Sequence, residues 1–215
     1  MRTSSKLLTL LAAVAVLSVA VGTANAGRFS ASEQRFRITW SSFELGGFTE
    51  LIRCRVTLEG SFHSRSFTKV AEALVGYITG GTIAHPCTGG EQWLFNGREV
   101  QNGTTLANTL PWHLRYESFS GTLPNITEVA FKIVGMRLLR EAELFGIRLR
   151  CTYTTTAAEP FKGPWRRNTS TRAWTEFQIE GSVRPESGSG CPTSNFLGTG
   201  PITTPAGAAI TVTLI

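Results

Sequence analysis

Hydrophobic and polar residues alternate one by one along much of the chain. In the stretch LIRCRVTLEGSFH, Cys54, Val56 and Leu58 share one face, while Arg53 and Arg55 lie on the other. A period of two is typical of strands that bury one side against a core. The same alternation predicts further strands over residues 35–40, 127–133, 146–156, 175–183 and 208–215.

Turn signals separate these strands. Gly-Gly pairs occur at 46–47, 80–81 and 89–90, and Asn-Gly pairs, which favour tight hairpins, occur at 96–97 and 102–103. Short strands divided by such turns predict an all-β fold, an antiparallel β-sandwich or a barrel-like form, with at most one or two short helices.

Four segments are harder to interpret from the pattern. We expect Lys69–Ile78 to be a strand buried on both sides, although Val70, Leu74 and Tyr77 also fit a helix. Met136–Phe145 is rich in helix formers and is expected to contain a short helix. Pro160–Arg167 and Arg184–Gly190 are interpreted as loops.

The N-terminal segment predicts secretion. Arg2 and Lys6 precede an apolar run over Leu7–Val21, and Ala24-Asn25-Ala26 supplies small residues for cleavage after Ala26. The apolar run is shorter than the roughly 20 residues that span a bilayer. We therefore expect a signal peptide at 1–26 and one secreted β-rich domain at 27–215, with no membrane span after cleavage.

The charge composition excludes several kinds of site. All 15 acidic residues are Glu, so an Asp-rich calcium loop, a paired-aspartate protease and a Ser-His-Asp triad are ruled out. Arg2 and Lys6 are the only charged residues of the signal peptide, so the net charge of +6 falls to +4 for residues 27–215. That small excess gives little support to a polyanionic partner, and no nucleic-acid partner is expected.

Four cysteines in an exported chain predict two disulfides. We expect Cys54–Cys87 and Cys151–Cys191, because each pair joins a strand to a nearby loop. Cys87 lies in AHPCTGG, so a nucleophilic thiol beside His85 and a zinc site are alternatives. No metal-ligand spacing accompanies His85, and we expect neither a metal nor another cofactor.

Three predicted strands carry Arg-x-Arg on their outward faces. If these strands were neighbours, six guanidinium groups would form one surface for a polyanion such as an anionic cell-wall polymer. The alternative is that the arginines are dispersed and paired with Glu. The residues are Arg35, Arg37, Arg53, Arg55, Arg148 and Arg150.

A second candidate surface lies in LPWHLRYESFSGTLPNI. Aromatic rings stack on sugars and charged side chains hydrogen-bond hydroxyls, so this stretch is a candidate carbohydrate site. The alternative is a strand in which Trp112, Leu114 and Tyr116 face the core. The candidate carbohydrate residues are Trp112, His113, Arg115, Tyr116 and Glu117.

Four stretches resemble an uncharacterised family of small secreted actinobacterial proteins. They are VTLEGSFHS (Val56–Ser64), LVGYIT (Leu74–Thr79), AHPCTGG (Ala84–Gly90) and LPWHLRYESFSGTLPNI (Leu110–Ile126). The resemblance covers Leu51–Ile133 and a later cysteine pair, with Gln101–Asn108 as an additional loop. It implies a secreted, disulfide-bonded β-rich domain and carries over no catalytic residues.

Taken together, these features favour a non-enzymatic secreted domain that binds a partner or has a structural role at the cell envelope. One alternative is a carbohydrate hydrolase that uses two glutamates, drawn from Glu91, Glu117, Glu141 and Glu143. Another is a secreted inhibitor or effector. No GxSxG motif is present to support an esterase.

Overall fold

The structure, a computed structural model, describes residues 27–46, 51–88, 92–95, 98–99, 110–144, 147–168, 173–187, 191 and 193–215. The predicted signal peptide and the Gln101–Asn108 loop lie outside the described residues. The described chain consists of strands and connections, as the alternating pattern predicts.

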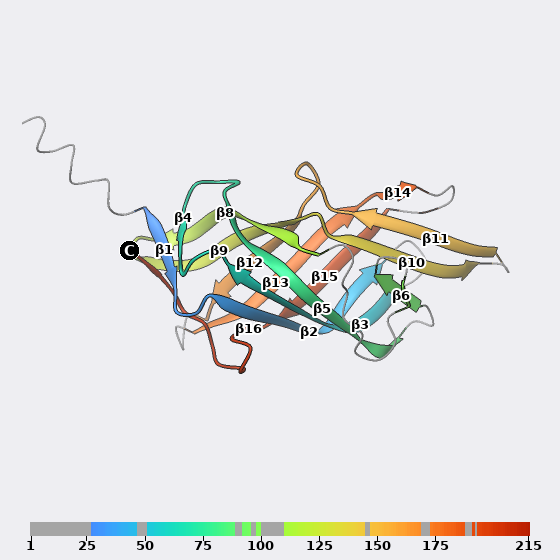
Figure 1. Ribbon diagram of the computed structural model, residues 1–215, viewed down its shortest axis with the longest axis horizontal. Coiled ribbons are helices and arrows are strands. Elements are labelled where there is room, and N and C mark those ends of the chain that lie inside the picture. Colours follow the sequence, from blue (N-terminus) through green and yellow to red (C-terminus); the bar gives the residue numbers. More distant parts are fainter. Residues whose placement is uncertain are drawn as a thin grey trace, which may run out of the picture.

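Eight strands form a closed antiparallel barrel (Figure 1). Each barrel strand pairs with the next one along the chain, and the last strand returns to the first, with Gly198 opposite Phe43. Of the two forms expected from the sequence, the barrel is therefore the one adopted. The barrel strands are β2 (Arg35–Gly46), β3 (Leu51–Phe62), β5 (Leu74–Thr88), β8 (Trp112–Thr122), β9 (Asn125–Val134), β12 (Phe161–Arg167), β13 (Trp174–Val183) and β15 (Ser194–Gly200). A short β16 (Ile202–Thr203) continues beyond β15 and pairs with β2.

A five-stranded sheet is built from segments inserted between barrel strands at one end. We call this end, drawn at the right in Figure 1, the insertion end. Its strand order is β14-β11-β10-β6-β7. The strands are β6 (Gln92–Phe95), β7 (Arg98–Glu99), β10 (Arg137–Leu144), β11 (Ile147–Thr154) and β14 (Pro185–Ser187).

A three-stranded sheet lies at the opposite end, which we call the terminal end because the C-terminus lies there (Figure 1). Its order is β17-β1-β4, formed by β1 (Arg28–Ala31), β4 (Ser66–Thr68) and β17 (Val212–Leu214). Phe29 and Phe67 from this sheet are buried with the aromatic core of the barrel. The first and last described strands are thus held side by side.

Aromatic side chains fill the barrel. Trp40, Trp112, Trp165 and Trp174 are all buried. Room for the rings comes from glycines on neighbouring strands, since a Cβ atom at Gly163 would lie 2.2 Å from the ring of Phe177. Alternation of large and small residues is how a small barrel closes around a solid core.

Both predicted disulfides are confirmed. Cys54 on β3 bonds Cys87 on β5, with Cα atoms 4.5 Å apart. Cys151 on β11 bonds Cys191, with Cα atoms 5.7 Å apart, and so ties the five-stranded sheet to the segment that leads into β15. The thiol and zinc interpretations of Cys87 are therefore wrong. The side chain of His85 is not among those that the structure describes.

Two segments expected to be helix or loop are strands instead. The helix expected within Met136–Phe145 is replaced by β10, which pairs with β11 over its whole length. Sheet pairing and the burial of Leu138 outweigh the helix propensity of these residues. Pro160–Arg167 contains β12, because Phe161 and Trp165 fill the core while β9 and β13 pair on either side.

The predictions for the other two segments are wrong in part. Within Lys69–Ile78 the strand begins at Leu74, and Val75, Gly76 and Ile78 are buried while Leu74 and Tyr77 are partly exposed. It is therefore not buried on both sides. The segment expected to be a loop at Arg184–Gly190 contains the short strand β14.

Candidate functional site

An open groove of about 780 Å³ crosses the outer wall of the barrel over β12, β13 and β15. Strand pairing aligns Lys162 with Glu180, and Glu180 with Leu197, so these three side chains form a row across the groove. The next pair along, Ser182 and Asn195, is joined by a side-chain hydrogen bond. The groove thus offers charged, amide and hydroxyl groups beside an exposed leucine.

The groove carries both signs of charge. Lys162 Nζ lies 3.6 Å from a carboxylate oxygen of Glu117 on β8. At the rim, Arg184 Nε lies 3.6 Å from a carboxylate oxygen of Glu159. Paired charges of opposite sign suit a partner with many hydroxyl groups better than a strongly anionic one.

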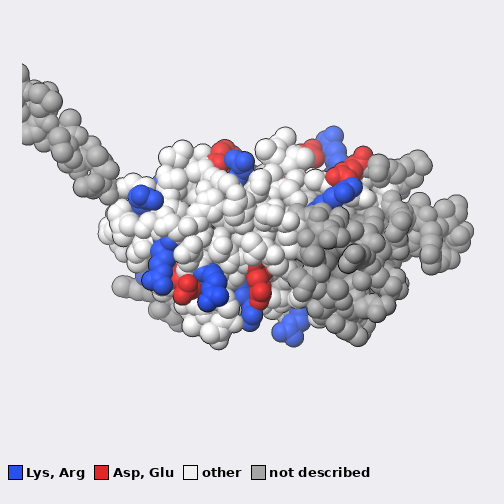
Figure 2. Space-filling view, in the orientation of Figure 1, with Lys and Arg blue, Asp and Glu red and all other residues white. Residues whose placement is uncertain are grey.

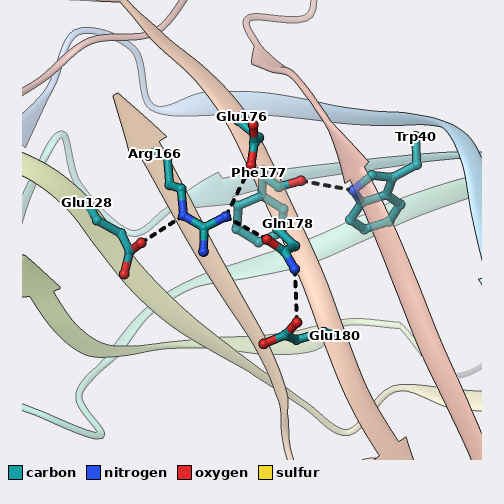
Figure 3. A network of polar contacts seen from close by, with 7 residues as sticks. All are labelled: Trp40, Glu128, Arg166, Glu176, Phe177, Gln178 and Glu180. Carbon is teal, nitrogen blue, oxygen red and sulfur yellow. Dashed lines mark hydrogen bonds and ion pairs between the residues drawn. The ribbon is translucent and has the colours of Figure 1, made fainter. Parts of the chain in front are cut away.

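A polar network orients Glu180, one of the two glutamates of the groove (Figure 3). Arg166 donates to Glu128 at 2.9 Å, to Glu176 at 3.1 Å and to Gln178 at 2.6 Å. Gln178 in turn donates to Glu180 at 2.9 Å. Partial burial alone would lower the pKa of Arg166, but the hydrogen bonds to the two glutamates outweigh it and raise this pKa.

The network lies on the outer surface of the wall, opposite the core. Figure 3 shows Trp40 beyond β13, where its indole N–H donates to the carbonyl of Phe177 at 3.2 Å. The same strand therefore anchors the core on one side and orients groove residues on the other, which gives the groove a rigid base.

The five residues of the predicted carbohydrate surface do not lie together. Trp112 is 0% exposed and Tyr116 is 2% exposed, and both point into the barrel. His113, Arg115 and Glu117 face outward. The core-strand interpretation is confirmed, and neither aromatic ring is placed to stack on a sugar. Burial also raises the pKa of Tyr116.

The first two Arg-x-Arg pairs lie on adjacent strands, with glutamates between them. Arg37 on β2 lies 2.7 Å from Glu59, and Arg53 on β3 lies 2.7 Å from Glu44. Figure 2 shows the same mixture on one face of the molecule, where acidic and basic side chains lie next to each other around a broad uncharged area.

The third pair is on a different sheet. Arg148 and Arg150 belong to β11, opposite Glu143 and Glu141 in the pairing register. The side chains of these four residues lie outside the description. The six arginines therefore do not come from three neighbouring strands, and polyanion binding remains a prediction.

Two histidines that the sequence analysis did not connect flank one tyrosine. The Tyr77 ring centroid lies 4.8 Å from that of His63 and 5.5 Å from that of His113. The pairing of β5 with β8 and the position of His63 directly after β3 bring them together. The described side chains contain no group of three or more His, Cys or Glu that could hold a metal ion.

The sequence does not mark Lys162, Glu180 and Asn195 as functional residues. Each is an ordinary polar position on its own strand, so no local signal marks it.

Comparison of the chain with family models, curated proteins and solved structures gives no match. Within the described part of the chain, no helix has the length and apolar character needed to cross a membrane.

Proposed function

We propose that this protein is a secreted, non-catalytic domain that binds carbohydrate at the cell envelope through the groove over β12, β13 and β15. The observation that carries the proposal is the row formed by Lys162, Glu180 and Leu197 on a rigid wall. Charged and amide groups beside an apolar side chain can hydrogen-bond sugar hydroxyls and pack against sugar C–H groups.

Export is part of the proposal. The apolar N-terminal run and the resemblance to secreted actinobacterial proteins support a signal peptide cleaved after Ala26. Two disulfides indicate an oxidising environment, which agrees with export.

Binding is favoured over hydrolysis by the lining of the groove. A glycosidase needs two carboxyl groups facing each other across the sugar. The groove contains Glu159 and Glu180, but Glu159 is paired with Arg184 and Glu180 accepts a hydrogen bond from Gln178.

The test is co-sedimentation of residues 27–215 with insoluble cell-wall polysaccharide over a salt series. We expect Lys162→Ala to weaken binding by about tenfold or more, because a hydrogen bond to a charged group contributes about 1.5–3 kcal/mol. Asn195→Ala should weaken it by about two- to tenfold, because a neutral hydrogen bond contributes about 0.5–1.5 kcal/mol. Arg37→Ala is the matched control, because it removes the same charge from an ion pair on β2.

The other possible results of the co-sedimentation test would favour a different function or contradict the proposal. Binding that fails for Arg37→Ala and falls steeply with salt would favour the polyanion surface instead. Release of new reducing ends would favour the hydrolase. Failure to bind any polysaccharide fraction would contradict the proposal.

A further inference from the structure

The sheet at the terminal end is open along the whole edge formed by β17. Arg28 and Ile215 exchange backbone hydrogen bonds of 3.3 and 2.9 Å, which fixes how β1 and β17 pair. Because antiparallel residues alternate in direction, Val212 and Leu214 turn their N–H and C=O groups away from β1. Among the described residues, none pairs with these four groups.

The opposite edge of the same sheet is closed at Ser66, although Thr68 also turns its N–H and C=O outward. On β4, the outward N–H of Ser66 donates to Ser64 Oγ at 3.2 Å. The carbonyl of Ser66 accepts from Arg28 Nη2 at 3.3 Å. Arg65 and Lys69 flank this strand, and charged residues at an edge discourage further pairing. The strand β17, with the sequence Val-Thr-Leu, has no such charge.

A pocket of about 460 Å³ runs along the open edge. Val212 and Leu214 form one side, and Ile126 and Trp174 contribute apolar surface. Val212 is only 4% exposed, so its unpaired backbone groups are sheltered from water. Such groups are destabilising by about 1–3 kcal/mol each unless a partner satisfies them.

The spacing of these groups indicates what the partner is. Two residues of a strand extend about 6.6–6.8 Å, so the edge repeats a donor and an acceptor at that interval. The backbone of another extended chain repeats its own groups at the same interval, whereas sugar hydroxyls do not. Pairing of this kind is an established way in which sheets bind peptides.

We propose that the open edge of β17 and its pocket bind an extended peptide segment. The segment adds a fourth strand to β17-β1-β4 and places one apolar side chain beside Trp174. This inference is independent of the carbohydrate groove, which lies on β12, β13 and β15.

The experiment begins with the unmodified domain. Synthetic peptides with blocked termini, chosen from a displayed library of random dodecamers, are titrated into residues 27–215. Amide hydrogen exchange is followed by NMR. We expect bound peptide to slow exchange at Val212 and Leu214 and to leave the Thr213 amide, which already faces β1, unchanged.

Two matched variants complete the test. Leu214→Pro removes an outward N–H that has no partner, so we expect binding to weaken by about tenfold or more with little loss of stability. Thr68→Pro removes an outward N–H from the other edge of the sheet, on β4, and binding should persist.

Several results would overturn the inference. One is a library that yields no binding peptide, and another is slowed exchange at residues other than Val212 and Leu214. Undiminished binding by Leu214→Pro would also refute it. A concentration-dependent dimer that Leu214→Pro dissociates would mean that a second copy of the chain, rather than a peptide, occupies the edge.

Discussion

Gly163 is the position at which the packing of the barrel can be tested most directly. A Cβ atom there would lie 2.2, 2.8 and 3.0 Å from three ring atoms of Phe177. That ring is 1% exposed and packs near Trp40, with centroids 6.2 Å apart, so it has little room to move. Gly163→Ala should therefore force a rearrangement of the core.

The expected loss combines two effects. Overpacking a dense core is destabilising by about 1–3 kcal/mol, while replacing glycine in a strand stabilises by about 0.4–1 kcal/mol through the unfolded chain. The net loss is roughly 1–2 kcal/mol, or a fall in Tm of about 2–8 °C for a domain of this size. Thermal unfolding of residues 27–215, followed by circular dichroism, measures it.

Two further variants isolate the cause. Gly80→Ala is the matched control, because its Cβ would meet Glu59 at an ordinary 3.6 Å, and we expect no loss of stability. Phe177→Leu leaves space that the methyl group introduced by Gly163→Ala can fill, so the double variant should lose at least about 1 kcal/mol less than the sum of the single variants. Additive losses, or a Gly163→Ala protein as stable as the parent, would refute this account of the core.

Three other predictions follow from the crosslinks and the titratable groups. Replacing Cys151 and Cys191 by serine should lower the free energy of unfolding by about 3–4 kcal/mol, measured by urea denaturation, and an unchanged midpoint would contradict it. The carboxylate of Glu33 accepts the N–H groups of the next two residues, which holds its pKa below 4.5. Its stabilisation is therefore present above pH 4.5 and is lost as the pH falls through the lowered pKa, so Glu33→Gln should be less stable than the parent near neutral pH and equally stable in strong acid. Burial raises the pKa of Tyr116 above 10, so the folded protein should lose stability as the pH rises past 10, and Tyr116→Phe should reduce that loss in alkaline unfolding curves.

The strands and their faces could be predicted because each depends on local sequence. Val56 and Leu58 alternate with Arg55 and Thr57, and burial of one face follows directly from that period. The disulfides could also be predicted, because export and an even number of cysteines leave few pairings. The strand at Met136–Phe145 could not be predicted, because its local propensity for helix competes with pairing to a strand that the segment itself does not specify.

The closure of the barrel and the position of the groove could not be predicted from the sequence, because both depend on the register between distant strands. Gly198 meets Phe43 only because eight strands tilt and curve until the last reaches the first. The row of Lys162, Glu180 and Leu197 requires the register of three strands, and Lys162 itself lies in a segment interpreted as a loop. A shift of one residue would turn Lys162 into the core.

The pairing of β15 with β2 also has a consequence for folding during synthesis. Every other barrel pair joins strands that follow each other along the chain, but β2 needs a partner that is made roughly 150 residues later. At about 5–20 residues per second, one edge of β2 remains unpaired for about 8–30 s in every new chain. Charged side chains discourage such edges from pairing between molecules. Glu44 belongs to the segment of β2, Phe43–Gly46, that pairs with β15, so it places a charged side chain at this edge until the barrel closes.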